Sequence, residues 1–210
     1  MRASEMASIG RKLYEYDACL RSSSGQGVLV GVDEAGRGPI AGPVFAAAVC
    51  FDSDLVLDCI YDSKALRKKA REHAYGLIVS EAASFGIASA SAKEIDELNI
   101  RQATLLAMRR AVGMLSVEHP FVVVDGKDIL GHNLNSQAIV GGDGLSMSIA
   151  AASILAKVSR DAFMDVLDDE YPGYGFARNK GYPTPDHYEA LKSLGPTPYH
   201  RISFRGVGRA

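Results

Sequence analysis

Residues 31–39 read GVDEAGRGP, in which two adjacent carboxylates precede a glycine-rich turn. The apolar run VLVGV at 28–32 leads directly to Asp33 and Glu34. Because this run is short, β-branched and bounded by glycine, it predicts a buried strand that ends near the acids. Side chains on a regular strand alternate between its faces, so the two carboxylates can converge only where the strand becomes irregular. The glycines that follow supply that freedom.

The turn after the acids places Arg37 between Gly36 and Gly38. Carboxylates beside an arginine and free backbone N–H groups can hold a hard cation and a phosphate together, since Mg²⁺ takes oxygen ligands and leaves positions open for phosphate. The alternative is a corner between a strand and a turn whose acids are merely solvated. Short motifs have weak specificity, so this stretch alone does not decide between the two.

The composition is typical of one globular domain, because the chain has 210 residues of which 47% are hydrophobic and 23% charged. The net charge of −2 excludes a polycation, so any contact with nucleic acid requires a local basic patch. Three cysteines without a C-x-x-C spacing indicate neither a disulfide framework nor a zinc site. The sequence contains no apolar leader and no run of membrane-spanning length, so we expect a soluble, cytoplasmic protein.

Hydrophobic periodicity and turn residues predict strands and helices in alternation. A short Gly/Pro connection joins the first two apolar runs, which favours their antiparallel pairing. The expected strands are 28–32, 44–51, 85–91, 121–126 and 138–140, and the expected helices are 1–21, 66–82, 93–98, 101–115 and 145–170.

Two further acids follow apolar runs. Asp125 ends the run FVVV at 121–124, and Asp143 lies in GGDG at 141–144, where we expect it to open the long helix. Taken singly, Asp125 could mark an Asp-Gly turn and Asp143 a helix N-cap. Together with Asp33 and Glu34 they place four carboxylates near strand ends, where sites form in open α/β sheets. Such a cluster needs cations, and a pair of divalent ions is one solution in nucleases, so the pattern predicts hydrolysis of a phosphodiester.

Basic and polar side chains that could contact a phosphate backbone occur in two places. On the helix 145–170, Ser146, Ser153, Lys157 and Arg160 recur at helical spacing, and a solvent-facing stripe is the alternative. The segment 171–210 interleaves arginines and lysines with tyrosines and phenylalanines, a mixture that suits phosphates and sugars. No histidine or cysteine nucleophile is indicated, and we expect His187 and His200 in this segment to bind or pack rather than to catalyse.

Taken in order, these motifs resemble the ribonuclease HII family over nearly all of residues 28–204. The stretches that carry the resemblance are VDEAGRGP (32–39), AGPV (41–44), DSK (62–64), VDG (124–126), Asp143 with SIAAASILAKV (148–158), and KGY (180–182). The N-terminal helix and the tail beyond Phe204 lie outside it, and we assign them no role.

The resemblance implies a ribonuclease H-like α/β fold, with a five-stranded mixed sheet flanked by helices and a small helical C-terminal part. We expect an N-terminal helix and linker over 1–27, a catalytic domain over 28–170, and a basic, aromatic segment over 171–210 packed on the same domain.

The resemblance also implies the reaction. It predicts an endonuclease that hydrolyses the RNA strand of RNA–DNA hybrids and cuts 5′ of single ribonucleotides in duplex DNA, leaving 5′-phosphate and 3′-hydroxyl ends. Two Mg²⁺ or Mn²⁺ ions would serve the catalysis, and the cellular role would be removal of ribonucleotides and RNA primers. Its partners would be the hybrid and ribonucleotide-containing duplexes, with no membrane, and the protein would be a monomer.

The resemblance assigns residues to roles by position. The metal-binding, catalytic carboxylates are Asp33, Glu34, Asp125 and Asp143. The 2′-hydroxyl and its neighbouring phosphates are sensed by the turn Gly36, Arg37 and Gly38, which fits the use of this hydroxyl to tell RNA from DNA. Tyr182 packs on the sugar that follows the ribonucleotide, and the remaining substrate-binding residues are Lys64, Ser153 and Lys157.

Two alternatives stand beside this interpretation. One is another member of the same broad fold, such as a type 1 ribonuclease H or a junction resolvase, which the turn at 36–38 disfavours. The other is a hybrid-binding module without catalysis, which four intact acids disfavour because buried carboxylates are costly without a cation.

Overall fold

The computed structural model describes residues 3–23, 27–52, 55–57, 60, 66–131 and 134–208. Its centre is a five-stranded sheet in the order β3-β2-β1-β4-β5. The strands are β1 (Val28–Ala35), β2 (Val44–Cys50), β3 (Ser84–Ala90), β4 (Pro120–Asp125) and β5 (Ser136–Ile139). β1, the first strand in the sequence, therefore lies in the middle of the sheet.

The sheet is mixed. β1 pairs with β2 and β2 with β3 in antiparallel fashion, whereas β1 with β4 and β4 with β5 are parallel. The expected five-stranded mixed sheet and the antiparallel pairing across the short Gly/Pro connection are both confirmed.

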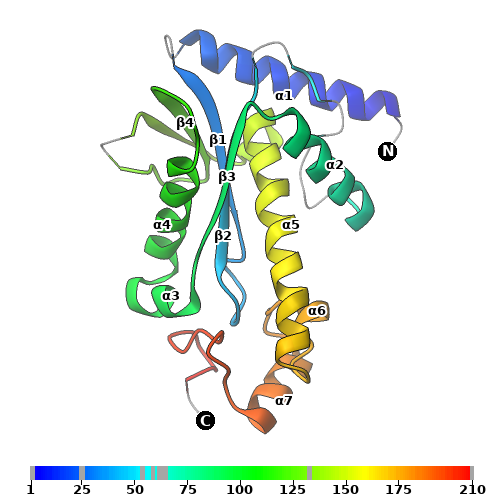
Figure 1. The fold of residues 1–210 in the computed structure, drawn as a ribbon, viewed down its shortest axis with the longest axis vertical. Coiled ribbons are helices and arrows are strands. Elements are labelled where there is room, and N and C mark those ends of the chain that lie inside the picture. The colour runs from blue at the N-terminus through cyan, green and yellow to red at the C-terminus, as the bar shows by residue number, and fades with distance from the viewer. Residues whose placement is uncertain are drawn as a thin grey trace.

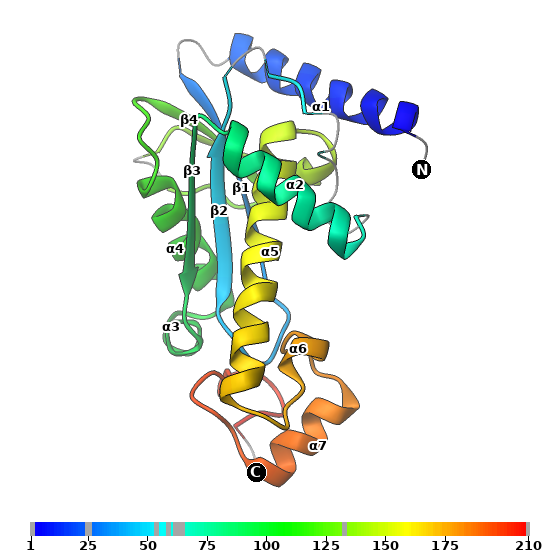
Figure 2. The same cartoon turned by 45° about the vertical axis from the view of Figure 1, so that its right-hand side comes forward.

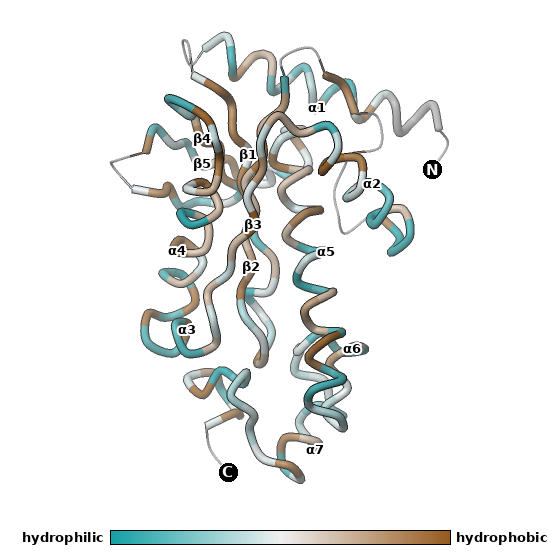
Figure 3. The backbone as a smooth tube through the Cα atoms, in the orientation of Figure 1, coloured by the Kyte–Doolittle hydropathy of each residue, from teal (hydrophilic) through white to brown (hydrophobic). Residues whose placement is uncertain are grey.

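Helices cover both faces of the sheet (Figures 1 and 2). On one face lie α3 (Ala92–Leu98) and α4 (Ile100–Gly113), and on the other lies the long α5 (Met147–Glu170). Outside α5 are α1 (Ala3–Ser23) and α2 (Lys68–Glu81). Figure 3 shows the apolar colouring along β1 and β4, whose alternate side chains enter separate apolar clusters on the two faces. This alternation decides which acid faces which helix.

α5 passes unusually close to β1 at Gly31. A Cβ on Gly31 would lie 2.1 Å from the carbonyl carbon of Ser148, so no larger residue fits there. Near the same point, Asp17 of α1 accepts hydrogen bonds from the backbone N–H and the hydroxyl of Ser148. The start of α5 is thus fixed against the central strand by contacts from two sides.

The C-terminal part lies at the far end of α5, at the bottom of Figure 1. It contains the short helices α6 (Phe176–Asn179) and α7 (Pro185–Leu194) and then an irregular segment. Backbone hydrogen bonds join it to the turn after β1, from the N–H groups of Ile40 and Ala41 to the Gly181 carbonyl. The expected small helical C-terminal part is present.

The start of α5 differs from the prediction. Asp143 does not open this helix, because it lies in a separate 3₁₀ turn, Gly142–Gly144. Ser146 is the N-cap, and its hydroxyl accepts from the Ile149 N–H at 3.2 Å. Asp143 therefore does not cap α5.

Among the described helices, none is both long and apolar enough to cross a membrane.

Candidate active site

Strand register brings the first two aspartates together. β1 and β4 are parallel with Val32 opposite Val124, so the next residue along each strand, Asp33 and Asp125, are neighbours. Val32 and Val124 point into the apolar cluster beneath α4, so the alternation of a strand turns the two aspartates to the α5 face. On that face the hydroxyl of Ser153, in α5, hydrogen-bonds the Asp33 carboxylate.

Asp143 completes a cluster of three carboxylates. One oxygen each from Asp33, Asp125 and Asp143 lies within 4.8 Å of the others. The Gly142 N–H donates to Asp125 Oδ1 at 2.7 Å, so the 3₁₀ turn that carries Asp143 is attached to the end of β4. Three oxygen donors at this spacing are the ligand type that hard divalent cations prefer.

Strand alternation directs Glu34 away from the α5 face, but its carboxylate still interacts with Asp33 at the edge of this cluster. β1 stays regular through Ala35, which pairs with Phe45 of β2, so the expected irregularity comes after both acids rather than between them. Glu34 therefore faces the α4 side, where Arg37 Nη1 donates to its Oε1 at 3.3 Å. It lines a small cleft there with Thr104 of α4. The predicted convergence thus includes three aspartates, with Glu34 at the edge.

A cavity of about 300 Å³ opens over the aspartates and gathers most of the predicted site. Its lining includes Asp33, Glu34, Gly36, Asp125, Ser153, Lys157, Arg160 and Tyr182. These residues come from β1, β4, α5 and the C-terminal part, which the fold brings together from distant parts of the sequence. The predicted substrate residue Lys64 lies outside the described residues, as does the whole stretch 62–64.

The acids in this cavity repel one another. Burial raises the pKa of Asp33 well above its ordinary value, and the charges of Glu34 and then Asp125 raise it further. Burial also raises the pKa of Glu34, against the lowering effect of Arg37. A bound cation would relieve this repulsion, so the electrostatics of the site fit a divalent metal.

The glycine-rich turn and Tyr182 meet at the other side of the cavity. A Cβ on Gly38 would lie 3.5 Å from Cε1 of Tyr182, which places the turn beside the tyrosine ring. The Tyr182 side chain is exposed, whereas its carbonyl oxygen accepts from the Thr184 N–H at 2.8 Å. The structure thus brings together two elements that the sequence analysis assigned to ribonucleotide recognition.

Two buried arginines support this turn. Arg160, 1% exposed, donates to the carbonyls of Ala41, Pro43 and Lys180. Arg201, 0% exposed, donates to the carbonyls of Gly36, Arg37 and Gly42. Burial lowers the pKa of Arg160 to about 10 and that of Arg201 to about 9.

The polar stripe predicted on α5 divides into two kinds of residue. Ser153 and Lys157 line the cavity, and Lys157 is paired with Asp161 at 2.7 Å. Ser146 and Arg160 are buried and bond within the protein, although Arg160 also borders the cavity, so the interpretation that they form an exposed stripe along a phosphate backbone is wrong. Their hydrogen-bonding capacity is used within the protein, by a helix cap and by carbonyls.

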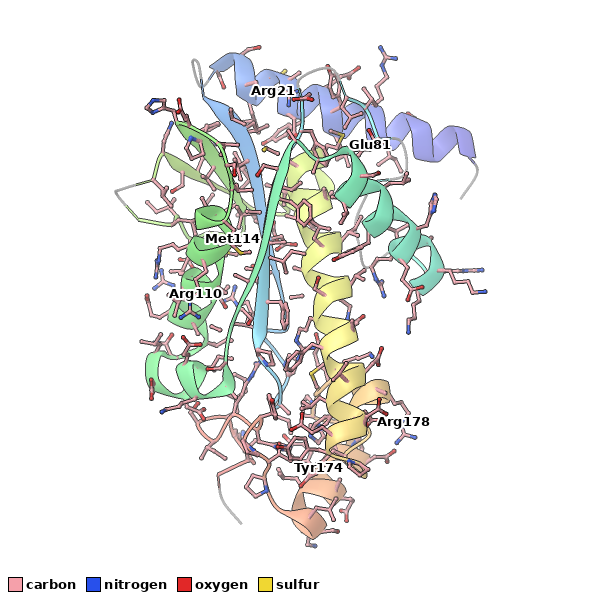
Figure 4. All side chains as sticks on the ribbon, in the orientation of Figure 1. Arg21, Glu81, Arg110, Met114, Tyr174 and Arg178 are labelled. Carbon is pink, nitrogen blue, oxygen red and sulfur yellow. The ribbon has the colours of Figure 1, made fainter. Side chains whose placement is uncertain are left out.

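Only some residues of the basic, aromatic segment 171–210 lie at the protein surface. Arg201, Tyr174 and Phe176 are buried, and Lys180 pairs with Asp165, so these residues support the fold rather than form a patch. Figure 4 shows Tyr174 within the C-terminal part and Arg178 at its outer surface, where Arg178 pairs with Asp186. The prediction of a basic, aromatic surface patch is therefore wrong for the residues of this segment that are buried.

His187 and His200 pack, as predicted. They are buried, and their Nε2 atoms lie 3.1 Å apart. His200 Nδ1 accepts from the Thr197 N–H, and His187 Nδ1 is 2.8 Å from the Tyr182 carbonyl. These contacts assign two neutral rings, in which His200 donates through Nε2 and His187 through Nδ1. The pair thereby attaches the backbone of Tyr182 to the interior.

The solved structures that share this fold are ribonucleases H. The ribonuclease H2 of Pyrococcus horikoshii matches with a TM-score of 0.73 and 26% identity, over 86% of this chain and 95% of its own. A Bst-RNase HIII structure in complex with Mn²⁺ shares the fold with a TM-score of 0.66 and 16% identity, over 91% of this chain and 71% of its own. The fold thus places this chain in the class of ribonuclease H-like nucleases.

Sequence comparison places the chain within one family of that class. The family model for ribonuclease HII matches residues 30–207. The ribonuclease HII of Halorhodospira halophila is 52% identical over 89% of this chain and 96% of its own, and that of Geobacter metallireducens is 47% identical over 94% and 92%. The chain belongs to the ribonuclease HII family, and it is an endonuclease of the ribonuclease H class.

Family membership also fixes the general requirements of the reaction. Ribonucleases H act on RNA–DNA hybrids and depend on divalent metal ions. Within the described part of the chain, the side chains whose spacing could hold a metal ion are Asp33, Asp125 and Asp143.

Proposed function

We propose that this protein cuts duplex DNA on the 5′ side of an embedded ribonucleotide, as well as the RNA strand of hybrids, by two-metal-ion catalysis with Mg²⁺ or Mn²⁺. The products are a 5′-phosphate and a 3′-hydroxyl, and the cellular role is removal of ribonucleotides and primers. The observation that carries the proposal is the shared cavity, which is lined by two of the clustered aspartates together with Gly36 and Tyr182.

The acids are proposed as the catalytic, metal-binding residues: Asp33, Glu34, Asp125 and Asp143. Bound to them, divalent ions would stabilise charge on the phosphate and lower the pKa of the attacking water. The chain itself fixes the ligand geometry, since Asp125 is held by the Gly142 N–H and Asp33 by the Ser153 hydroxyl. Glu34, which faces the neighbouring cleft, is proposed as the ligand at the edge of the cluster.

The proposed substrate-binding residues surround these acids. Lys157 reaches the cavity from α5 and suits a phosphate of the cleaved strand. The turn Gly36, Arg37 and Gly38 is proposed to contact the 2′-hydroxyl, and the Tyr182 ring beside it to pack on the next sugar. Ser153 and Lys64 complete the proposed set.

The proposed active form is a monomer, and its proposed location is the cytoplasm. Residues 28–170 are proposed as the catalytic domain, residues 1–27 as an added helix and linker, and residues 171–210 as a segment packed on it. The hydrogen bonds of Arg201 to the turn after β1 support this last assignment.

The decisive experiment uses a DNA duplex with one ribonucleotide, labelled on the cut strand, with Mg²⁺, with Mn²⁺ and with a chelator. We expect a metal-dependent cut immediately 5′ of the ribonucleotide. An all-DNA duplex is the matched control, and it should remain intact. Cutting confined to long RNA–DNA hybrids would keep the ribonuclease H activity and reject the proposed reading of a single ribonucleotide.

A further inference from the structure

The glycine-rich turn owes its shape to a residue that no motif in the sequence assigns to it. Arg201 lies more than 160 positions after Gly36 in the chain and is fully buried. Its three guanidinium nitrogens donate to three carbonyls of the turn region, at 2.6 Å to Gly36, 2.9 Å to Arg37 and 2.9 Å to Gly42. One side chain therefore spans the whole turn.

These bonds also orient the N–H groups of the turn. In a planar trans peptide the N–H points opposite to the C=O. Because Arg201 binds the carbonyls of Gly36 and Arg37 from the interior, the N–H groups of Arg37 and Gly38 point the other way, to the exposed side of the turn. Neither N–H donates to any described residue. Two adjacent donors are thus left available beside the Tyr182 ring.

The electrostatics of the turn favour an oxygen acceptor at this place. A buried guanidinium at the carbonyl end of each peptide polarises it, which strengthens the positive end at the N–H. Arg160 adds a second buried cation, since a Cβ on Gly36 would lie 1.9 Å from its Nε. Both guanidinium groups bind backbone carbonyls. The carboxylates whose charges act on them, Asp161 on Arg160 and Asp96 on Arg201, form no ion pair with them among the described residues.

We propose that Arg201 is a positioning residue for ribonucleotide selection, which holds the turn so that the N–H groups of Arg37 and Gly38 face the ribose 2′-hydroxyl. This inference rests on the proposed function. Arg201 does not touch substrate, because it is buried behind the turn, and it acts through the two peptides that it orients.

The test compares Arg201→Lys with Asp96→Asn. A lysine keeps the charge but cannot donate to three separate carbonyls. Asp96 anchors the same segment from its other side, since it accepts from the N–H groups of Ile202 and Ser203, and it does not contact the turn. Both variants should loosen this segment, but Arg201→Lys alone should release the turn.

Binding is measured in chelator, so that no cleavage occurs, with a duplex carrying one ribonucleotide and with the same duplex in DNA. We expect Arg201→Lys to weaken binding of the ribonucleotide duplex about tenfold and that of the DNA duplex less than twofold. Asp96→Asn should leave unchanged the ratio of the affinities for the ribonucleotide duplex and the DNA duplex. Amide ¹H–¹⁵N spectra of the free proteins should show shifted Arg37 and Gly38 signals in Arg201→Lys alone.

Two results would overturn the inference while leaving the proposed function intact: an unchanged ratio in Arg201→Lys, or equal weakening for both duplexes. If the unaltered protein makes no metal-dependent cut at a single ribonucleotide in the cleavage experiment, the proposed function fails and the inference with it. Phe204→Leu is the milder variant should Arg201→Lys not fold, because the Phe204 ring lies 5.1 Å from the guanidinium carbon. It should lower the ratio in the same direction by a smaller factor, and no change would again count against the inference.

Discussion

Two groups of charged side chains lie beside the same cavity: the aspartate cluster of Asp33, Asp125 and Asp143, and the arginine pair of Arg160 and Arg201. Their surroundings compensate their charges in different ways. In the aspartate cluster, burial raises the pKa of Asp33, and the charges of Glu34 and Asp125 raise it further. The arginine pair, Arg160 and Arg201, is complete in itself, because its six hydrogen bonds all end on backbone carbonyls. The first group is therefore arranged to bind an ion, and the second to hold the backbone in shape.

This difference predicts opposite consequences of neutralising a charge in the two groups. Removal of an acid should abolish function while easing repulsion, whereas removal of an arginine should destabilise the fold by leaving carbonyls unpaired. The experiments below follow from that contrast.

The largest effect is expected for Asp125→Asn. Loss of one carboxylate should lower cleavage about 100-fold or more, equivalent to about 3 kcal/mol of transition-state stabilisation. In chelator the variant should unfold at a temperature no lower than that of the unaltered protein, because the repulsion with Asp33 is reduced. Asp186→Asn, an exposed acid paired with Arg178, is the control and should leave cleavage unchanged. Near-normal turnover in Asp125→Asn would remove this residue from the site.

Arg160→Lys should act mainly on stability. A single ammonium cannot replace three guanidinium hydrogen bonds to Ala41, Pro43 and Lys180, so the free energy of unfolding should fall by about 3 kcal/mol. Thermal and urea melts measure it. Arg110→Lys, at a surface ion pair with Glu94, should change stability by less than about 1 kcal/mol. If the two variants melt alike, the arginine pair is not the scaffold described above.

Acid pH should weaken the fold through the histidine pair. Burial, followed by the charge of His187, lowers the pKa of His200 from 6.5 to about 4, and burial lowers the pKa of His187. The unfolded chain then binds more protons between about pH 6.5 and 4, so the free energy of unfolding decreases as the pH is lowered through this range, by about 3 kcal/mol.

Other groups also titrate in this range, so the histidine contribution is the difference between two proteins. Melts at several pH values should show a shallower dependence in His200→Gln than in the unaltered chain. If the stability of the two proteins depends on pH in the same way, the histidine pair does not control the loss of stability at acid pH.

A smaller effect is expected for Tyr182→Ala. Its ring is 46% exposed, so the free energy of unfolding should change by less than about 1 kcal/mol. Preference for a single ribonucleotide over uniform hybrid should fall about tenfold, as lost stacking on a sugar or base predicts. A lower melting temperature with unchanged preference would show the tyrosine to be structural.

Much of the aspartate cluster could be predicted from the sequence, because each acid follows an apolar run whose strand end locates it. The sequence did not reveal that β1 would direct Glu34 to the α4 side while its carboxylate still interacts with Asp33. That depends on β1 staying regular through Ala35, which the pairing with Phe45 of β2 enforces. Nor did the sequence distinguish a 3₁₀ turn at Asp143 from a helix N-cap, since glycine-rich sequence is compatible with both.

The arginine pair could not be recognised from the sequence. Local pattern placed Arg160 on a polar stripe and Arg201 in a basic segment, because surface arginines are common and buried ones rare. Five of their six acceptors are backbone carbonyls more than 110 positions away, and a carbonyl has no residue type that a motif could record. Such a role becomes visible only when the chain is folded.

The parallel pairing of β1 with β4 has a consequence for the order in which the chain folds. β1 and β2 can form their hairpin early, since a short turn joins them, whereas β4 begins some 90 residues after β1. During synthesis Asp33 therefore has Glu34 as its neighbouring acid until Asp125 and Asp143 arrive. The repulsion between Asp33 and Asp125 is thus met only when β4 joins the sheet, after β1 and β2 have had the opportunity to form their hydrophobic contacts.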